Sequence, residues 1–297
     1  MNKVIGLINA WSCETFIEPA MLQAIEYCDE VIVSVGFHSE EVKKFEDNTY
    51  DIVSKFIDND KVKYVPTHFG GTHYESKTPT LNAMLEASDN FEVGNWIWLL
   101  DCDEFYFRED WEDIKKNIFD SEYDCVETKE KFFYVNMENY LLNDRRRLFK
   151  ITDKSDHYVP LQRWNRPKEN VFKHDSYMYH YSLLLDPYCK KAFWSTEYPT
   201  EQNYKVHWMD EVYLKFDLND QETWVNKNEQ LFGYRTPFQI SDFITNDGLL
   251  FNHEGEHPYY IEDASLPFDI RLTEIKDFRK LYEDIEDVIE FDSRPLL

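Results

Sequence analysis

Residues 96–105 read WIWLLDCDEF and join the most apolar run of the chain to a group of acids. Trp96–Leu100 is short and wholly apolar, which predicts a buried strand. Asp101 and Asp103 follow at the carboxyl end of that strand, separated by one residue. Two carboxylates so placed offer the hard oxygen ligands that Mn²⁺ and Mg²⁺ prefer. We therefore predict a divalent-cation site at Asp101 and Asp103.

A solvated acidic turn is the simpler alternative for these residues. Acids often precede a helix, and the spacing of Trp111, Ile114 and Ile118 predicts a helix after Asp110. This alternative leaves unexplained why Asp101 directly follows the most apolar run of the chain. The sequence therefore favours the cation site.

Strands and helices alternate on the N-terminal side of this stretch. Val4–Ala10, Val31–Val35 and Val62–Val65 predict buried strands. The capping-box pattern of Thr15–Glu18 predicts the start of a first helix, and Thr78-Pro79 predicts the start of a second. The alternation predicts an α/β fold with a mostly parallel central sheet flanked by helices. Ligands of such sheets bind beyond the carboxyl ends of the strands.

The regular alternation ends near residue 125. Short strand-like pieces then mix with polar, proline-containing stretches, which predicts a mixed α+β C-terminal half. Apolar residues at helical spacing over 272–289 predict a terminal amphipathic helix.

Composition narrows the class of ligand. The chain has 297 residues, 42% of them hydrophobic, which is enough for one large domain with its own core. Asp and Glu outnumber Lys and Arg by 58 to 32, so the formal charge is −26. Such a surface repels nucleic acids and anionic membranes, although it does not forbid a local basic groove. An acidic protein that binds an anion needs a cation at the site, which again favours a metal.

Membrane and cysteine signals indicate a cytoplasmic protein. No run approaches the roughly 20 apolar residues of a membrane span, and the first ten residues lack the pattern of a secretory signal. The five cysteines are scattered without CxxC spacing, so we expect reduced thiols.

The N-terminal half resembles the GT-A glycosyltransferases, in particular their family-two-like branch. The matching segments are LINAWSCE (Leu7–Glu14), DEVIVSVG (Asp29–Gly36), a helix that carries Lys77 and Asn82, and WIWLLDCDEF (Trp96–Phe105). They cover about residues 4 to 110, with weaker echoes to about residue 260. The chain departs from the pattern at VGFHSEE, where many relatives carry a Ser/Thr-Asp pair that contacts uridine. The resemblance therefore does not fix the nucleobase.

This resemblance implies a metal-dependent transfer of a sugar, with inversion, from a nucleotide-sugar to a hydroxyl group. A UDP-sugar is the expected donor, with Mn²⁺ or Mg²⁺ as cofactor. Ala10, Trp11 and Glu14 would line the nucleoside pocket, whereas Lys77 and Asn82 would border the sugar or the phosphates. The alternatives are simple packing for Trp11 and charge compensation at a helix N-terminus for Glu14.

Further residues are candidates for the donor site. Asp101 and Cys102 belong to the triplet that faces the donor, and Arg163 is a candidate for the diphosphate. The cluster Arg145–Arg147 is a second basic candidate, and pairing with surface carboxylates is the common alternative for both.

The third metal ligand has two candidates. His180, in MYHYS, resembles the histidine ligand of many GT-A enzymes, and its alternative is a hydrogen-bonded core histidine. The segment HEGEHP, with His253 and His257, is the rival. Gly255 and Pro258 break a helix there, so the zinc-protease geometry fails and a polar loop is expected.

Sugar transfer with inversion also needs a general base for the acceptor hydroxyl. Asp210 and Glu211 lie at about the spacing that relatives show, and a solvated acidic pair is the alternative. The acceptor itself is left open among a glycan, a lipid-linked sugar, a protein and a modified nucleobase.

Two rival functions remain. A nucleotidyltransferase would usually carry a glycine-rich basic loop after its first strand, which LINAWSCETF lacks. A calcium-dependent carbohydrate-binding module would not need the strand–helix–strand opening. We expect a catalytic domain over 1–260, divided into a nucleotide-sugar-binding half (1–125) and an acceptor-side half (126–260). A helical extension over 261–297 would follow it.

Overall fold

The computed structural model describes residues 2–70, 73–119, 121–133, 137–153, 170–184 and 251–262, together with 220, 222, 223 and 226. The chain divides into two compact units built from interleaved segments. Unit 1 comprises Met1–Lys131, Asp144–His180 and Gly255–Leu266, and unit 2 comprises Phe132–Asn143, Tyr181–Glu254 and Pro267–Leu297. The domain limits at 125 and 260 stay predictions, and the predicted helix over 272–289 lies outside the described residues.

Four parallel strands form the first half of the sheet in unit 1. They are β1 (Val4–Ala10), β2 (Glu30–Val35), β3 (Val62–Tyr64) and β4 (Trp96–Leu100). Their order is β3-β2-β1-β4, and every pairing among them is parallel. The predicted α/β fold with a parallel sheet is confirmed. All four carboxyl ends meet at one edge, where the ligands of such sheets bind.

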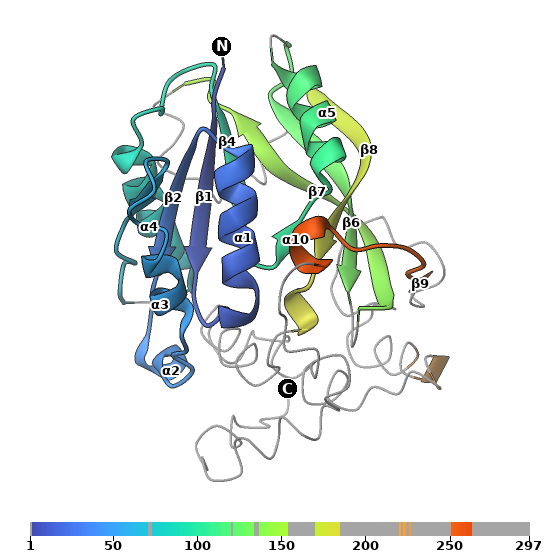
Figure 1. Cartoon of the computed structure of the whole chain (residues 1–297), viewed down its shortest axis with the longest axis horizontal. Coiled ribbons are helices and arrows are strands. Elements are labelled where there is room, and N and C mark those ends of the chain that lie inside the picture. The colour runs from blue at the N-terminus through green and yellow to red at the C-terminus, as the bar shows by residue number, and fades with distance from the viewer. Residues whose placement is uncertain are drawn as a thin grey trace. The chain divides into compact units, whose positions relative to one another are not determined.

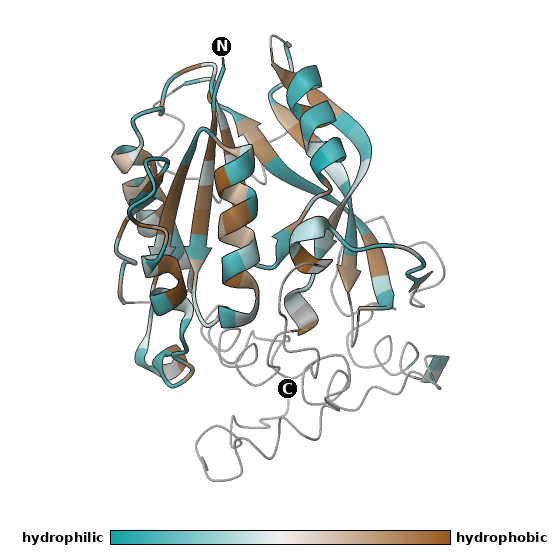
Figure 2. Cartoon of the chain, in the orientation of Figure 1, coloured by the Kyte–Doolittle hydropathy of each residue, from teal (hydrophilic) through white to brown (hydrophobic). Residues whose placement is uncertain are grey.

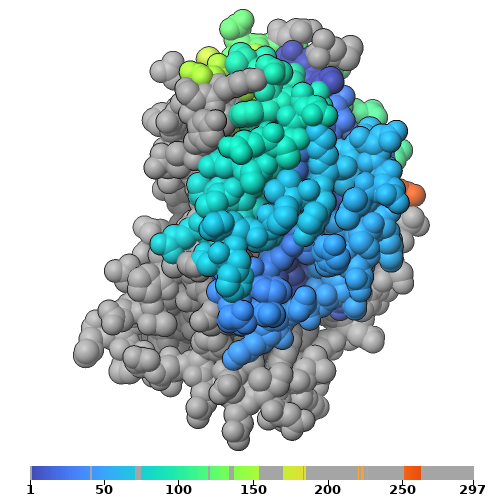
Figure 3. Space-filling view, turned by 90° about the vertical axis from the view of Figure 1, so that its left-hand side faces the viewer, coloured from blue at the N-terminus to red at the C-terminus, as the bar shows by residue number. Residues whose placement is uncertain are grey.

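Helices cover the parallel strands on both faces (Figure 1). The helices of the described ranges are α1 (Glu14–Tyr27), α2 (Glu40–Lys43), α3 (Thr49–Ser54), α4 (His73–Ala87), α5 (Arg108–Ile118) and α10 (Tyr259–Glu262). Figure 3 shows the segments of α2, α3 and α4, coloured from blue to cyan, as one surface of this unit.

The alternation of side chains along the strands creates a separate core on each face. Ile5, Leu7, Ile97 and Leu99 pack with Met84 and its neighbours on α4. Trp98 points the other way, toward Tyr27 of α1 and Trp111 of α5. Figure 2 shows hydrophobic residues along β1 and a mixture of hydrophobic and hydrophilic residues along α1. Each buried side chain of this size contributes about 1.5–3 kcal/mol, so the strands that carry the site are firmly held.

The second half of the sheet contains β5 (Glu104–Phe105), β6 (Cys125–Phe133), β7 (Asn139–Lys150), β8 (Val171–His180) and β9 (Phe251–Asn252). β7 pairs antiparallel with β4, and β8 pairs antiparallel with β5. The pairing therefore changes from parallel to antiparallel beside β4, the strand that precedes Asp101.

The described part of unit 2 contains an aromatic cluster. Phe133 stacks on Tyr181 at 4.9 Å between ring centroids, and the ring of His253 meets Phe133 at 5.5 Å. Tyr140 stacks on Phe251 of β9 at 5.6 Å. β9 pairs with β7 through Asn139↔Asn252, so the strand and the cluster support each other.

Both helix starts predicted from local caps are wrong. α1 begins at Glu14, and the carbonyl of Cys13 accepts its first helical hydrogen bonds. The Glu14 N–H donates to the Asp47 carboxylate at 2.9 Å, so a tertiary partner replaces the Thr15–Glu18 capping box. α4 begins at His73, five residues before Thr78, and Pro79 lies inside it.

No helix in the described ranges is long and apolar enough to cross a membrane. The cysteines described, Cys13, Cys28, Cys102 and Cys125, are buried free thiols.

Candidate functional site

The acidic triplet, Asp101–Asp103, directly follows β4, and Asp101 lies on the side of the sheet that α4 covers. Leu99 faces α4, and Asp101 follows two positions later at the α4 side. The amide of Gln23 on α1 clamps the next segment, because it donates to the Glu104 carbonyl at 3.0 Å and accepts from Tyr106 N–H at 2.8 Å. Helix α1 therefore fixes the backbone directly after the triplet.

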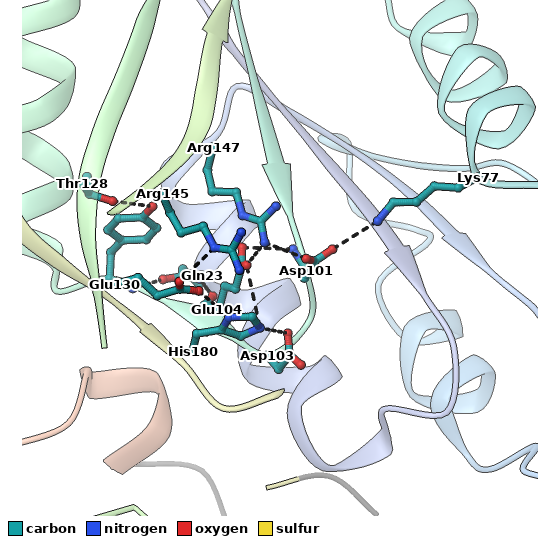
Figure 4. A network of polar contacts seen from close by, with 11 residues as sticks. Gln23, Lys77, Asp101, Asp103, Glu104, Thr128, Glu130, Arg145, Arg147 and His180 are labelled. Carbon is teal, nitrogen blue, oxygen red and sulfur yellow. Dashed lines mark hydrogen bonds and ion pairs between the residues drawn. The ribbon is translucent and has the colours of Figure 1, made fainter. Parts of the chain in front are cut away.

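Asp101 lies between two cations from different elements (Figure 4). Its Oδ1 is 3.7 Å from Nζ of Lys77 on α4, and its Oδ2 is 2.7 Å from Nη2 of Arg147 on β7. The Asp101 side chain is 38% exposed, whereas that of Lys77 is 15% exposed. Asp101 is thus a solvent-accessible carboxylate that is already neutralised by the protein.

Arg147 has a second and deeper partner. Its Nη2 also donates to Oε1 of Glu104, which is fully buried. Burial raises the pKa of Glu104 to about 7, and the Arg147 guanidinium opposes that rise. Burial would lower the pKa of Arg147, but the carboxylates of Glu104 and Asp101 outweigh it and raise this pKa above its ordinary value. Arg147 therefore stays charged and joins a buried acid to an exposed one.

His180 lies between two further carboxylates. Its Nδ1 is 2.6 Å from Oε1 of Glu130, and its Nε2 is 3.4 Å from Oδ1 of Asp103. Burial would lower the pKa of His180, but Asp103 and the other carboxylates raise it to about 9. Burial would raise the pKa of Glu130, but Arg145 and His180 lower it to about 2. The imidazole is therefore fixed at both nitrogens.

Strand geometry explains the two arginines. Side chains alternate along a strand, so Arg145 and Arg147 share the site face of β7. Arg145 pairs with Glu130 at 2.9 Å. Arg146 points away and pairs with Glu127 at 2.7 Å. All three arginines of the cluster thus pair with a buried acid, rather than with the surface carboxylates of the common alternative, and two of them do so on the site face.

Asp103 and His180, two of the ligands that the sequence predicted for a divalent cation, lie side by side, with Nε2 of His180 3.4 Å from Oδ1 of Asp103. The Glu130 carboxylate beside Nδ1 orients the ring so that Nε2 points toward Asp103, as carboxylates commonly do from the far nitrogen of metal-bound histidines. Asp101 supplies a further oxygen that solvent can reach. In the described ranges, the candidate ligands whose donor atoms lie within 4.8 Å of one another are Glu104, Glu130 and His180, a group that contains neither Asp101 nor Asp103. The two acids of this group are fully buried and pair with Arg147 and Arg145, whereas Asp101 is 38% exposed and can be reached by an ion from solvent.

The structure brings together Lys77, Asp101, Asp103 and His180. Cys102, which separates the two aspartates in the sequence, is buried. Asn82 is half-buried on α4. Arg163, Asp210 and Glu211 lie outside the described residues.

The residues predicted for the nucleoside pocket lie after β1. Ala10 is buried at the strand end, and Trp11 is half-buried. The Glu14 carboxylate accepts hydrogen bonds from Asn48 N–H at 3.1 Å and from Asn48 Nδ2 at 2.8 Å. Glu14 therefore ties α1 to the loop before α3.

The rival histidines belong to different units. His257, in unit 1, is buried with its ring 6.1 Å from that of Tyr179, whereas His253 packs in the aromatic cluster of unit 2. The segment between them is not helical, as expected.

Sequence reasoning missed Gln23 and Glu130 and left Arg147 undecided. The alternation of Arg145–Arg147 on a strand was the available signal for the arginine. Glu130 has no local signal, because its role depends on the pairing of β6 with a strand some fifty residues away.

Comparisons with known proteins concern the fold. No protein-family model and no curated protein matches the chain. Among solved structures, residues 1–349 of TarS from S. aureus match with a TM-score of 0.40 and 13% identity over 76% of this chain and 78% of that one. A 4-diphosphocytidyl-2C-methyl-D-erythritol synthase matches with a TM-score of 0.35 and 14% identity over 70% and 98%.

The 2-C-methyl-D-erythritol 4-phosphate cytidylyltransferase (IspD) of Francisella tularensis matches with a TM-score of 0.36 and 9% identity over 59% of this chain and 91% of that one. At these values the likenesses decide nothing about activity, which must be sought in the side chains of the site.

Proposed function

We propose that this chain is a metal-dependent glycosyltransferase that moves a sugar from a nucleotide-sugar donor to a hydroxyl acceptor. One observation carries the proposal. At the carboxyl end of β4, an exposed carboxylate, two cations and a histidine held between two carboxylates converge within unit 1. Such a group can hold a cation and receive a diphosphate at the edge where α/β sheets bind ligands.

The reaction breaks the bond between the anomeric carbon of the sugar and the diphosphate oxygen. A bond from the same carbon to the acceptor oxygen forms, and the acceptor proton passes to a general base. The bonding electrons leave with the nucleoside diphosphate, which gains one negative charge. The site must therefore stabilise negative charge on the leaving group.

Asp101, Asp103 and His180 are proposed to hold Mn²⁺ or Mg²⁺, which when bound neutralises charge on the leaving diphosphate. Glu130 orients His180, and the buried Arg147 keeps a positive charge beside Asp101. Burial of these groups strengthens their electrostatic effect relative to water.

The remaining roles follow the resemblance. Ala10, Trp11 and Glu14 are proposed for the nucleoside, and Asn82, Cys102 and Arg163 for other parts of the donor. Asp210 or Glu211 is proposed as the general base, and a UDP-sugar as the donor.

The products distinguish this proposal from nucleotidyl transfer. A glycosyltransferase given nucleotide-sugars, Mn²⁺ and a panel of hydroxyl acceptors releases a nucleoside diphosphate. A nucleotidyltransferase given a nucleoside triphosphate and a sugar phosphate releases pyrophosphate instead. We expect the diphosphate, its loss in Asp103→Asn, and unchanged release in Asp58→Asn, an exposed acid elsewhere on the chain. Pyrophosphate release alone would refute the proposal.

A further inference from the structure

We propose that Lys77 and Arg147 exchange partners when the donor binds. In the structure both neutralise Asp101. When Asp101 turns to a bound metal ion, Lys77 and Arg147 would both contact the diphosphate, so that the metal ion and the diphosphate bind cooperatively. This inference rests on the proposed function and adds a coupling between its two ligands.

The geometry distinguishes a fixed partner from an exchangeable one. Arg147 is anchored by Glu104, which is fully buried and has no access to solvent. Its other partner, Asp101, is 38% exposed. Lys77 approaches Asp101 from α4, on a different side from Arg147 (Figure 4). A metal ion can therefore draw the Asp101 carboxylate away from Lys77 and Arg147, while Arg147 remains paired with Glu104.

Charge explains why each ligand alone binds weakly. A cation that arrives alone must compete with Lys77 and Arg147 for the two oxygens of Asp101. A diphosphate that arrives alone meets the Asp101 carboxylate beside the same two cations. When both ligands bind, Asp101 serves the cation and the two side chains serve the diphosphate, so every charge has an opposite partner. Each ligand thereby strengthens the other, and the coupling is reciprocal.

Removal of the Lys77 or Arg147 charge should change the affinity for Mn²⁺ and the affinity for the diphosphate in opposite directions. Without Lys77, Asp101 is easier for a cation to take, so Mn²⁺ alone binds more tightly. The diphosphate loses one of its partners, so it binds more weakly. A side chain that only supports the local structure would weaken both affinities.

The test is calorimetric titration of Mn²⁺ alone, UDP alone, and UDP with saturating Mn²⁺. Wild-type protein should show a coupling of roughly 5- to 150-fold, the usual range between linked ligands. Lys77→Met should bind Mn²⁺ alone more tightly, bind UDP with Mn²⁺ more weakly, and lose most of the coupling. Arg147→Met should act in the same way. Arg146→Met, on the opposite face of β7, is the matched control and should keep the wild-type values.

The outcomes separate this inference from the proposed function. Arg147→Met leaves the buried Glu104 carboxylate without its arginine partner, so the folding of this variant is checked by thermal unfolding. If Arg147→Met does not fold, Lys77→Met alone decides the test. Cooperative wild-type binding with opposite shifts in Lys77→Met supports the exchange. Wild-type binding of UDP with Mn²⁺ but without coupling, or parallel loss of both affinities in Lys77→Met, overturns the exchange and leaves the proposed function standing. If neither UDP nor GDP binds with Mn²⁺, both fail.

Discussion

At the scale of single residues, the contacts of His180 make the stability of the protein depend on pH. Asp103 and Glu130 raise the pKa of His180 from 6.5 to about 9 despite its burial. A histidine whose pKa rises on folding stabilises the fold fully below its unfolded pKa, and this stabilisation is lost as the pH rises through about 9. The full effect is on the order of 3 kcal/mol, at about 1.4 kcal/mol per pH unit.

We expect metal-free protein to lose thermal stability between about pH 7.5 and pH 9, because in this range His180 holds its proton in the folded protein but is neutral in the unfolded chain. Glu104, whose pKa is raised to about 7, has largely ionised below this window. His180→Gln should show a much flatter dependence of the melting temperature on pH over the same range. Equal slopes in the two proteins would show that His180 does not carry the charge assigned to it.

The sequence could predict part of this site. Asp101 and Asp103 follow an apolar strand, and the resemblance pointed to His180, which indeed lies 3.4 Å from Asp103. Glu130 and Arg147 could not be assigned from local pattern, because their partners depend on how β6, β7 and β8 come together.

At the scale of elements, the apolar strands were predictable and the helix starts were not. A run such as VIGLINA is buried on both faces wherever it lies in a parallel sheet. The start of α1 depends instead on Asp47, a residue more than thirty positions away that receives the Glu14 N–H. Helix α4 likewise runs through Thr78-Pro79, and Ser76 and Thr80 hold the backbone of His68 by hydrogen bonds. At the start of α1, a tertiary partner thus replaces the local cap.

The packing of α5 against β4 leads to a second prediction. Trp111 is buried, its ring stacks on Trp98 at 4.2 Å, and its Nε1 donates to the Tyr27 carbonyl at 3.3 Å. Trp111→Ala should lower the free energy of unfolding by about 3–5 kcal/mol, because it leaves a large cavity. Val93→Ala, at a 62% exposed position, should change it by less than about 0.5 kcal/mol. Urea unfolding measures both, and similar values for the two would contradict this packing.

At the scale of the whole molecule, the formal charge of −26 opposes the folded state through repulsion. Salt screens this repulsion, so raising NaCl from about 10 mM to about 300 mM near pH 7.5 should raise the melting temperature of metal-free protein. Repetition near pH 5.5, where fewer net charges remain, should give a smaller rise. A melting temperature that falls with salt would instead mean that ion pairs, such as those around Asp101, dominate the electrostatic balance.

The binding of UDP with and without Mn²⁺ tests the central claim most directly. We predict calorimetric binding of UDP, or of another nucleoside diphosphate, that depends on Mn²⁺ and is abolished in Asp103→Ala while the variant stays folded. If no nucleoside diphosphate binds in a Mn²⁺-dependent manner to the wild-type protein, the carboxylates beyond β4 do not form a donor site, and the proposed glycosyl transfer is wrong.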